Sequence, residues 1–286
     1  MKQLLVAVCV VTISVSAFAQ DAGSGRVDRI APLWSTQDAT PIPTGQIDLR
    51  VAFQWVTAGA PANGGDSDDD FALTPTIVWG TCDNVELSIG TTAWLGDGGD
   101  MGALEDGNFD TNVGLLWRLS DQDGDMPALA VSGAMRLPTG DGSSGVDGEL
   151  RLILTNDYDS GIRSHVNVFG VSINGNNDET SRYGNHVHLS DVFGGGDHDT
   201  RHFQWGVTLG MDGPLCDDGA VRWVADYVHR SSRREGRSNM NLLELGVEWD
   251  MPDAGNLGIA TLIGLDRTGD TPNFGVGITY SHTLAN

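Results

Sequence analysis

Hydrophobic and polar residues alternate along most of the chain beyond residue 44. The stretch Pro127–Tyr158 shows the pattern well, with Leu129 and Val131 on one parity and Ser132 on the other. Because successive side chains of a strand point to opposite faces, such alternation predicts strands with one apolar and one polar face. The segment Gly140–Gly148 consists mainly of Gly, Ser and Asp, which favour turns, so the whole stretch predicts a β-hairpin.

Twelve segments with this alternation follow one another. Most run 10 to 14 residues, whereas strands of soluble sheets average about 5–6 and membrane strands need about 9–11. Short turns alternate with generally longer loops, as in bacterial outer-membrane barrels. The sequence therefore predicts an all-β fold, an antiparallel transmembrane β-barrel of about 12 strands with short periplasmic turns and longer extracellular loops. The predicted strands lie at about residues 45–57, 71–81, 85–96, 108–120, 127–139, 148–158, 162–175, 201–212, 220–231, 239–251, 256–268 and 272–284.

The seventh of these segments departs from strict alternation. Its apolar parity slips between Val168 and Val171. A β-bulge near Phe169 and Gly170 would restore the parity, so we predict a bulge there.

Two further features favour a membrane barrel over a soluble sheet. No arginine falls on the apolar parity at mid-depth, where facing lipid would cost about 2–4 kcal/mol. If odd strands run outward and even strands inward, aromatic residues gather near both strand ends, as in the aromatic girdles of membrane barrels. Trp79, Trp117, Trp223 and Trp249 come near the periplasmic ends, and Trp55, Phe71, Phe109, Phe203 and Phe274 near the outer ends.

The amino-terminal residues predict export. Lys2 precedes an apolar run from Leu4 to Val15, and Ala17-Phe18-Ala19 has the small-x-small pattern of a signal-peptide cleavage site. Residues 1–19 are therefore predicted to be a signal peptide. Together with the barrel pattern, this predicts an outer-membrane location, with outer-membrane lipid and the barrel assembly machinery as partners.

The mature chain is predicted to have two parts. Residues 20–44 form an irregular segment, because Pro32, Pro41 and Pro43 interrupt regular ladders. This segment is either a plug of the lumen or a periplasmic tail. Residues 45–286 form the barrel.

Charge and cysteine content exclude several functions. The formal net charge is −23, from 39 acidic and 16 basic residues, and a chain this acidic repels nucleic acid. No cofactor motif is present, so none is predicted. Cys82 and Cys216 fall in short turns on opposite sides of a twelve-stranded ring. Since bridged Cα atoms lie within about 7 Å, we predict no disulfide between them.

Two stretches carry a family resemblance. The segment Arg136–Leu154, RLPTGDGSSGVDGELRLIL, resembles a hairpin motif of the outer-membrane β-barrel transporters of the phenol meta-pathway degradation type. The segment Ala31–Arg50 is similar to the stretch that leads into the first strand of that family. The resemblance implies a barrel that takes up small, aromatic or hydrophobic molecules, and it carries over no catalytic residues. Asn176–Thr200 is an insertion relative to the connection expected for that family.

Charged residues of both signs fall on the predicted inward parity. One interpretation is a charge-lined path in which arginine and acidic rows orient a small solute. The other is a salt-bridge network that fills a narrow barrel. The predicted solute-path residues are Asp48, Arg50, Arg118, Arg136, Glu149, Arg151, Arg222, Asp226, Glu244 and Glu248, and Glu86 and Asp110 share their parity.

Other candidate chemistry gives two alternative functions. His186, His188, His198 and His202 lie in or beside the long loop 176–202 with several aspartates, but their spacing matches no metal motif, and no metal site is predicted. A structural or adhesive surface barrel with acidic, cation-binding loops is the first alternative. A lipid-modifying barrel enzyme is the second, and His229 and His282 are the histidines that face lipid on its strands. No enzyme activity is predicted, because no local motif supplies a serine and an orienting group beside them.

Overall fold

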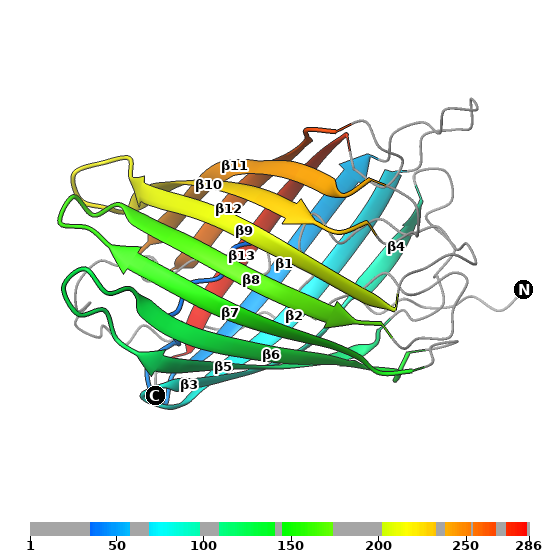
Figure 1. Ribbon diagram of the computed structural model, residues 1–286, viewed down its shortest axis with the longest axis horizontal. Helices are drawn as coiled ribbons and strands as arrows, with labels where there is room; N and C mark the ends of the chain where they lie inside the picture. The colour runs from blue at the N-terminus through cyan, green and yellow to red at the C-terminus, as the bar shows by residue number, and fades with distance from the viewer. Residues whose placement is uncertain are drawn as a thin grey trace, which may run out of the picture.

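The computed structural model describes residues 35–57, 69–97, 109–140, 145–173, 202–232, 238–252, 254–266 and 273–284. These residues form one antiparallel sheet that closes on itself, because β1 pairs with both β2 and β13 (Figure 1). The strands are β1 (Ile47–Thr57), β2 (Asp69–Cys82), β3 (Val85–Thr91), β4 (Ala93–Asp97), β5 (Thr111–Ser120), β6 (Ala128–Leu137), β7 (Asp147–Asp157), β8 (Arg163–Ser172), β9 (Phe203–Pro214), β10 (Val221–Arg230), β11 (Met240–Met251), β12 (Gly255–Gly264) and β13 (Phe274–Leu284).

The twelve predicted strands are confirmed, with one interruption. The third predicted strand is divided at Thr92 into β3 and β4, which both pair with β2 and occupy one position in the ring. The division coincides with the start of β5. The last residue pair between β3 and β5 is Thr91 with Thr111. Beyond that point Phe109, with a φ of 66°, donates its N–H to the Thr92 carbonyl at 2.9 Å. The ring therefore has twelve positions although thirteen strands are numbered.

The predicted bulge in β8 is wrong. Its register with β7 and β9 runs without a shift from Arg163 to Ser172. Phe169 and Val171 are buried on the same face as Arg163, so the inner wall is itself apolar at these positions. The guanidinium carbon of Arg151 lies 4.6 Å from the centroid of the Phe169 ring, which gives this inward aromatic residue a cation–π partner.

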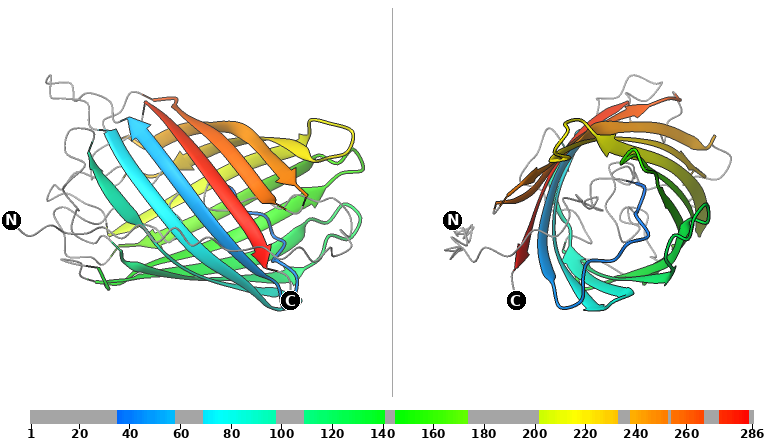
Figure 2. Two further views of the ribbon diagram at one scale, coloured as in Figure 1. Left: turned by 180° about the vertical axis from the view of Figure 1, so that it is seen from behind. Right: turned by 90° about the vertical axis from the view of Figure 1, so that its left-hand side faces the viewer.

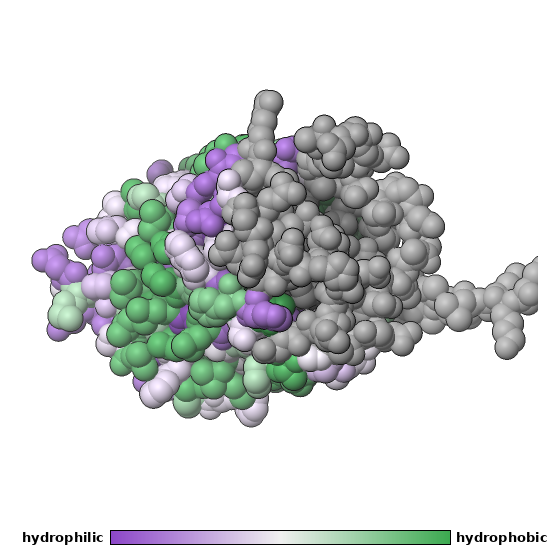
Figure 3. Space-filling view, turned by 45° about the vertical axis from the view of Figure 1, so that its right-hand side comes forward, coloured by the Kyte–Doolittle hydropathy of each residue, from purple (hydrophilic) through white to green (hydrophobic). Residues whose placement is uncertain are grey.

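The outer face of the barrel carries the apolar side chains. Leu150 is 65% exposed, and leucine, valine and isoleucine side chains on most of the other strands are also exposed. Figure 3 shows hydrophobic residues gathered around the middle of the described surface and hydrophilic residues toward one end. Such a band suits a hydrocarbon surrounding, as in transmembrane β-barrels. In the described part of the chain, no helix is long and apolar enough to cross a membrane.

The two ends of the barrel differ in their connections. At one end, here called the short-turn end, adjacent strands are joined by residues 83–84, 121–127, 158–162, 215–220 and 252–254. The short-turn end lies at the left of Figure 1, and the strands join through longer connections at the right. Of the predicted girdle residues near the short-turn end, Trp79, Trp117 and Trp249 are each about half exposed. At the other end, Trp55 packs edge-on against Phe274, with ring centroids 6.2 Å apart.

Candidate functional site

The residues predicted to line a solute path lie on the inner wall of the barrel, with one exception. Arg118 lies at the rim of the short-turn end, where its Nη1 is 2.9 Å from Asp121 Oδ1 and its Nη2 donates to the Asp83 carbonyl. Arg118 is partly exposed because it lies two residues before the end of β5 at Ser120. The other predicted residues are buried, and they are Asp48, Arg50, Arg136, Glu149, Arg151, Arg222, Asp226, Glu244 and Glu248.

Several of the wall arginines are held by carboxylates. Arg136 contacts both Asp110 and Asp147, and its Nη2 lies 2.7 Å from Asp147 Oδ2. Asp110 also accepts the backbone N–H of Gly140 at 2.8 Å, which ties the network to the connection after β6. Burial of such a charge is tolerated only when it is paired and hydrogen-bonded, and two carboxylates meet this condition for one guanidinium.

A second cluster centres on Asp212 of β9. Its carboxylate accepts hydrogen bonds from Arg163 Nε and Arg222 Nε, both at 2.9 Å, and lies 2.8 Å from His165 Nε2. His165 Nδ1 is 2.9 Å from the hydroxyl of Thr155. Only Arg222 of this cluster was among the predicted residues. The period-two inward run of Arg163, His165 and Asn167 in β8 is the sequence signal that points to the cluster.

The segment Ser35–Thr44 lies inside the barrel. Figure 2, in the view from the short-turn end, shows this first described segment crossing the interior of the ring of strands. Its backbone N–H groups donate to side chains of five different strands. The pairs are Ser35 with Glu244 at 2.9 Å, Thr36 with Asp226 at 3.3 Å, Gln37 with Asn167 at 2.7 Å, Ala39 with Thr155 at 3.0 Å and Ile42 with Glu86 at 3.0 Å.

Side chains of the segment add further contacts. Asp38 Oδ2 lies 2.6 Å from Arg163 Nη1, and Gln37 Oε1 accepts the Ser132 hydroxyl at 2.9 Å. Through Arg163, Asp38 joins the segment to the Asp212 cluster. Through Ser132, Gln37 joins the segment to the polar inner wall at β6. The segment is thus held on several sides. These partners could not be predicted, because the residues of the segment show no periodicity.

The segment leaves the lumen along Gly80 of β2. The Gly45 N–H donates to the Gly80 carbonyl at 2.7 Å, and the Gly80 N–H donates to the Gln46 carbonyl at 3.0 Å. A Cβ at residue 80 would overlap the carbonyl oxygen of Pro43. Glycine is therefore required for this close approach of two backbones.

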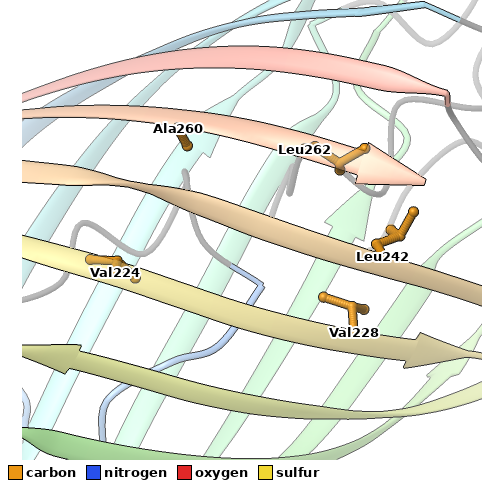
Figure 4. Close-up of a cluster of buried hydrophobic side chains, with 5 residues drawn as sticks. All are labelled: Val224, Val228, Leu242, Ala260 and Leu262. Atoms are coloured by element: carbon orange, nitrogen blue, oxygen red, sulfur yellow. The ribbon is translucent and has the colours of Figure 1, made fainter. Parts of the chain in front are cut away.

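One part of the inner wall is apolar. Val224 and Val228 of β10, Leu242 of β11, and Ala260 and Leu262 of β12 form a buried cluster (Figure 4). Because Val224 and Val228 flank the acidic Asp226 on β10, apolar and acidic surfaces adjoin on this side of the lumen.

The remaining candidate residues do not form a second site. The loop residues 176–200, with their histidines and aspartates, lie outside the described residues, and in the described part no cluster of three or more His, Cys, Asp or Glu side chains could hold a metal ion. His229 Nδ1 lies 2.8 Å from Asn241 Oδ1, and its ring is 5.4 Å from that of Trp205. Among the described contacts, neither His229 nor His282 bonds a serine hydroxyl.

Both described cysteines are free thiols at the short-turn end. Cys82 ends β2 and Cys216 follows β9, six positions apart in the ring of twelve. Cys216 lines a cavity of about 470 Å³ with Asp218, Arg222 and neighbouring turn residues. A hydrogen bond from the thiol to Asp218 raises the pKa of Cys216, so this thiol is less reactive than an ordinary exposed cysteine.

Comparisons with known proteins address the fold. No protein-family model and no curated protein matches the chain, so the resemblance to the phenol meta-pathway family is not confirmed. The COG4313 outer membrane channel from Pseudomonas putida F1 has a similar structure, with a TM-score of 0.59 and 14% identity over 86% of this chain and 98% of that one. The NanC porin has a TM-score of 0.52 and 9% identity over 84% of this chain and 99% of the porin. The chain shares its fold with this channel and this porin.

Proposed function

We propose that this protein is an outer-membrane channel for small molecules. The observation that carries the proposal is a closed barrel with an apolar outer face and a charged, hydrogen-bonding inner wall. In this arrangement the signal peptide 1–19 is removed, the short-turn end faces the periplasm and the longer connections face outward. The fold shared with two channels supports the proposal.

The proposed channel is narrow and selective. The segment Ser35–Thr44 crosses the lumen, and the arginine–carboxylate clusters occupy part of the remaining cross-section. We infer that Ser35–Thr44, the described part of the predicted segment 20–44, acts as a plug rather than a periplasmic tail. Small solutes then pass between the plug and the wall. The buried apolar cluster around Leu242 gives one side of the lumen an apolar lining, which suits a solute with an apolar or aromatic body.

The charges of the described inner wall favour cations. That wall carries nine carboxylates and six guanidinium groups, so acidic groups are in excess. Fixed charges near a narrow path select ions of opposite sign. The carboxylates belong to Asp48, Glu86, Asp110, Asp147, Glu149, Asp212, Asp226, Glu244 and Glu248, and the guanidinium groups to Arg50, Arg136, Arg151, Arg163, Arg222 and Arg230.

Liposome swelling tests the transport proposal. Proteoliposomes containing the native protein are expected to swell faster than empty liposomes in glycine or a pentose, and no faster in a large dextran, because the plugged lumen excludes large solutes. Heat-modifiable mobility on electrophoresis confirms that the inserted protein is folded. Equal swelling of protein-containing and empty liposomes in every solute would reject the transport function.

A structural barrel is the second candidate. The observation that favours it is the ion-pair network, because Arg136 pairs with Asp147, and Arg163 and Arg222 share the carboxylate of Asp212. A filled barrel of this kind gives a rigid surface scaffold without a solute path. The swelling measurement separates the two candidates, since only a channel accelerates solute entry.

A further inference from the structure

The inner wall recognises the main chain of the segment Ser35–Ile42 more than its side chains. Five strands supply the acceptors for its N–H groups, and these acceptors are carboxylate, amide and hydroxyl oxygens. The wall also supplies donors, because Arg151 Nη1 donates to the Ser35 carbonyl at 2.5 Å. Hydrogen bonds to the main chain bind peptides with little dependence on their side chains.

Asn167 makes the most peptide-specific contact. Its Oδ1 accepts the Gln37 N–H at 2.7 Å, and its Nδ2 donates to the Gln37 carbonyl at 3.0 Å. A single amide side chain therefore reads both polar groups of one peptide residue. A simple ion cannot both donate to Oδ1 and accept from Nδ2, whereas a peptide residue offers an N–H and a carbonyl for this pair.

The amino-terminal end of the bound segment meets negative charge. Ser35 N lies 2.9 Å from Glu244 Oε2, and Asp226, whose register partner is Glu244, accepts the next N–H. In a separate peptide, the nitrogen at this position would be a charged α-amino group. The positive charge of an α-amino group would be attracted to these two neighbouring carboxylates, so a free amino terminus would bind more tightly than an uncharged amide.

We propose that this wall is a binding site for short peptides with a free amino terminus, and that the segment Ser35–Ile42 occupies the site as an internal competitor. The proposal rests on the proposed channel function and names its solute class. The peptide runs with its amino terminus at Glu244 and Asp226, its third residue at Asn167 and its fifth residue at Thr155.

Isothermal titration in detergent tests this site without requiring transport. The full-length variant Ser35→Pro/Ala39→Pro loses the N–H groups that Glu244 and Thr155 accept, while every wall residue is retained. The probe is the pentapeptide Ser-Thr-Gln-Asp-Ala with a free amino terminus. We expect saturable binding to the variant and about tenfold weaker binding to the native chain, where the tethered segment competes at an effective concentration of about millimolar order.

Three controls make the result specific. The N-acetylated pentapeptide is expected to bind the variant about tenfold more weakly, because it lacks the ammonium group. Adding Asn167→Val to the variant is expected to abolish binding. The variant Thr40→Pro, which removes an N–H that donates to Asp38 within the segment, is expected to bind like the native chain.

The outcomes separate this site from the transport function. Absence of saturable binding to a correctly folded double variant, or equal binding of free and acetylated peptides, would overturn the proposal even if the protein conducts. Peptide binding without liposome swelling would retain the site and reject the channel. If the double variant does not fold, peptide binding by the single variant Ser35→Pro is compared with that by Thr40→Pro.

Discussion

The variant Ser35→Pro/Ala39→Pro is expected to raise the single-channel conductance several-fold above that of the native chain. Proline has no backbone N–H, so the hydrogen bonds to Glu244 and Thr155 are lost while those wall side chains stay in place. A net hydrogen bond contributes about 0.5–1.5 kcal/mol, and one to a charged acceptor about 1.5–3 kcal/mol. Losing both favours release of the segment from the wall, and the lumen then widens. Planar-bilayer recording of the two proteins measures the change.

The matched control for this experiment is Thr40→Pro. It introduces the same residue into the same segment, but the Thr40 N–H donates to Asp38 Oδ1, within the segment itself, at 3.0 Å. We expect its conductance to stay near the native value. Equal conductance of the double variant and the native chain would show that the segment does not restrict the path.

Replacing Asp212 with alanine is expected to lower the free energy of unfolding by about 3–5 kcal/mol. The carboxylate is fully buried and accepts from Arg163, Arg222 and His165, so its removal leaves two guanidinium groups close together without their shared partner. Removing one partner of a buried ion pair lowers the free energy of unfolding by far more than the intact pair contributes, because the remaining charge stays desolvated. Equilibrium unfolding in urea, with the protein in lipid or detergent micelles, measures the loss.

Asp121→Ala is the control variant for Asp212→Ala. It removes a carboxylate that pairs with an arginine at the surface. Asp121 lies 2.9 Å from Arg118, but its side chain is 76% exposed. Exposed ion pairs contribute about 0–1 kcal/mol, so this variant is expected to unfold close to the native protein. Similar losses for the two variants would contradict a special role of the Asp212 cluster.

The strands could be predicted because a barrel wall imposes one rule on every residue. Each side chain faces either an apolar exterior or a polar lumen, and the period of two records this choice in the sequence. Leu150 and Leu152 on the outside and Glu149 and Arg151 on the inside follow this rule. The rule fails at β8, because Phe169 and Val171 are apolar residues of the inner wall. Their parity suggests a β-bulge, but the register of β8 with β7 contains none.

The contacts of the inner wall could not be predicted from alternation. Parity places Arg136 and Arg222 inside but does not tell which carboxylate on a neighbouring strand each one meets. The segment Ser35–Thr44 has no periodicity, and its partners lie far away in sequence, 209 positions in the case of Glu244 and 130 in the case of Asn167. Such contacts follow from the closure of the barrel, which brings strands from all parts of the chain around one interior.

Single-channel recording of the native protein across a KCl gradient tests the central claim most directly. The claim is that a small-molecule path runs through the lumen between the segment Ser35–Thr44 and a wall with an excess of carboxylates. The prediction is small, resolvable conductance steps with a reversal potential displaced toward that of K⁺. A flat baseline from protein shown to be folded would contradict the path, and a reversal potential displaced toward that of Cl⁻ would contradict the charge of its wall.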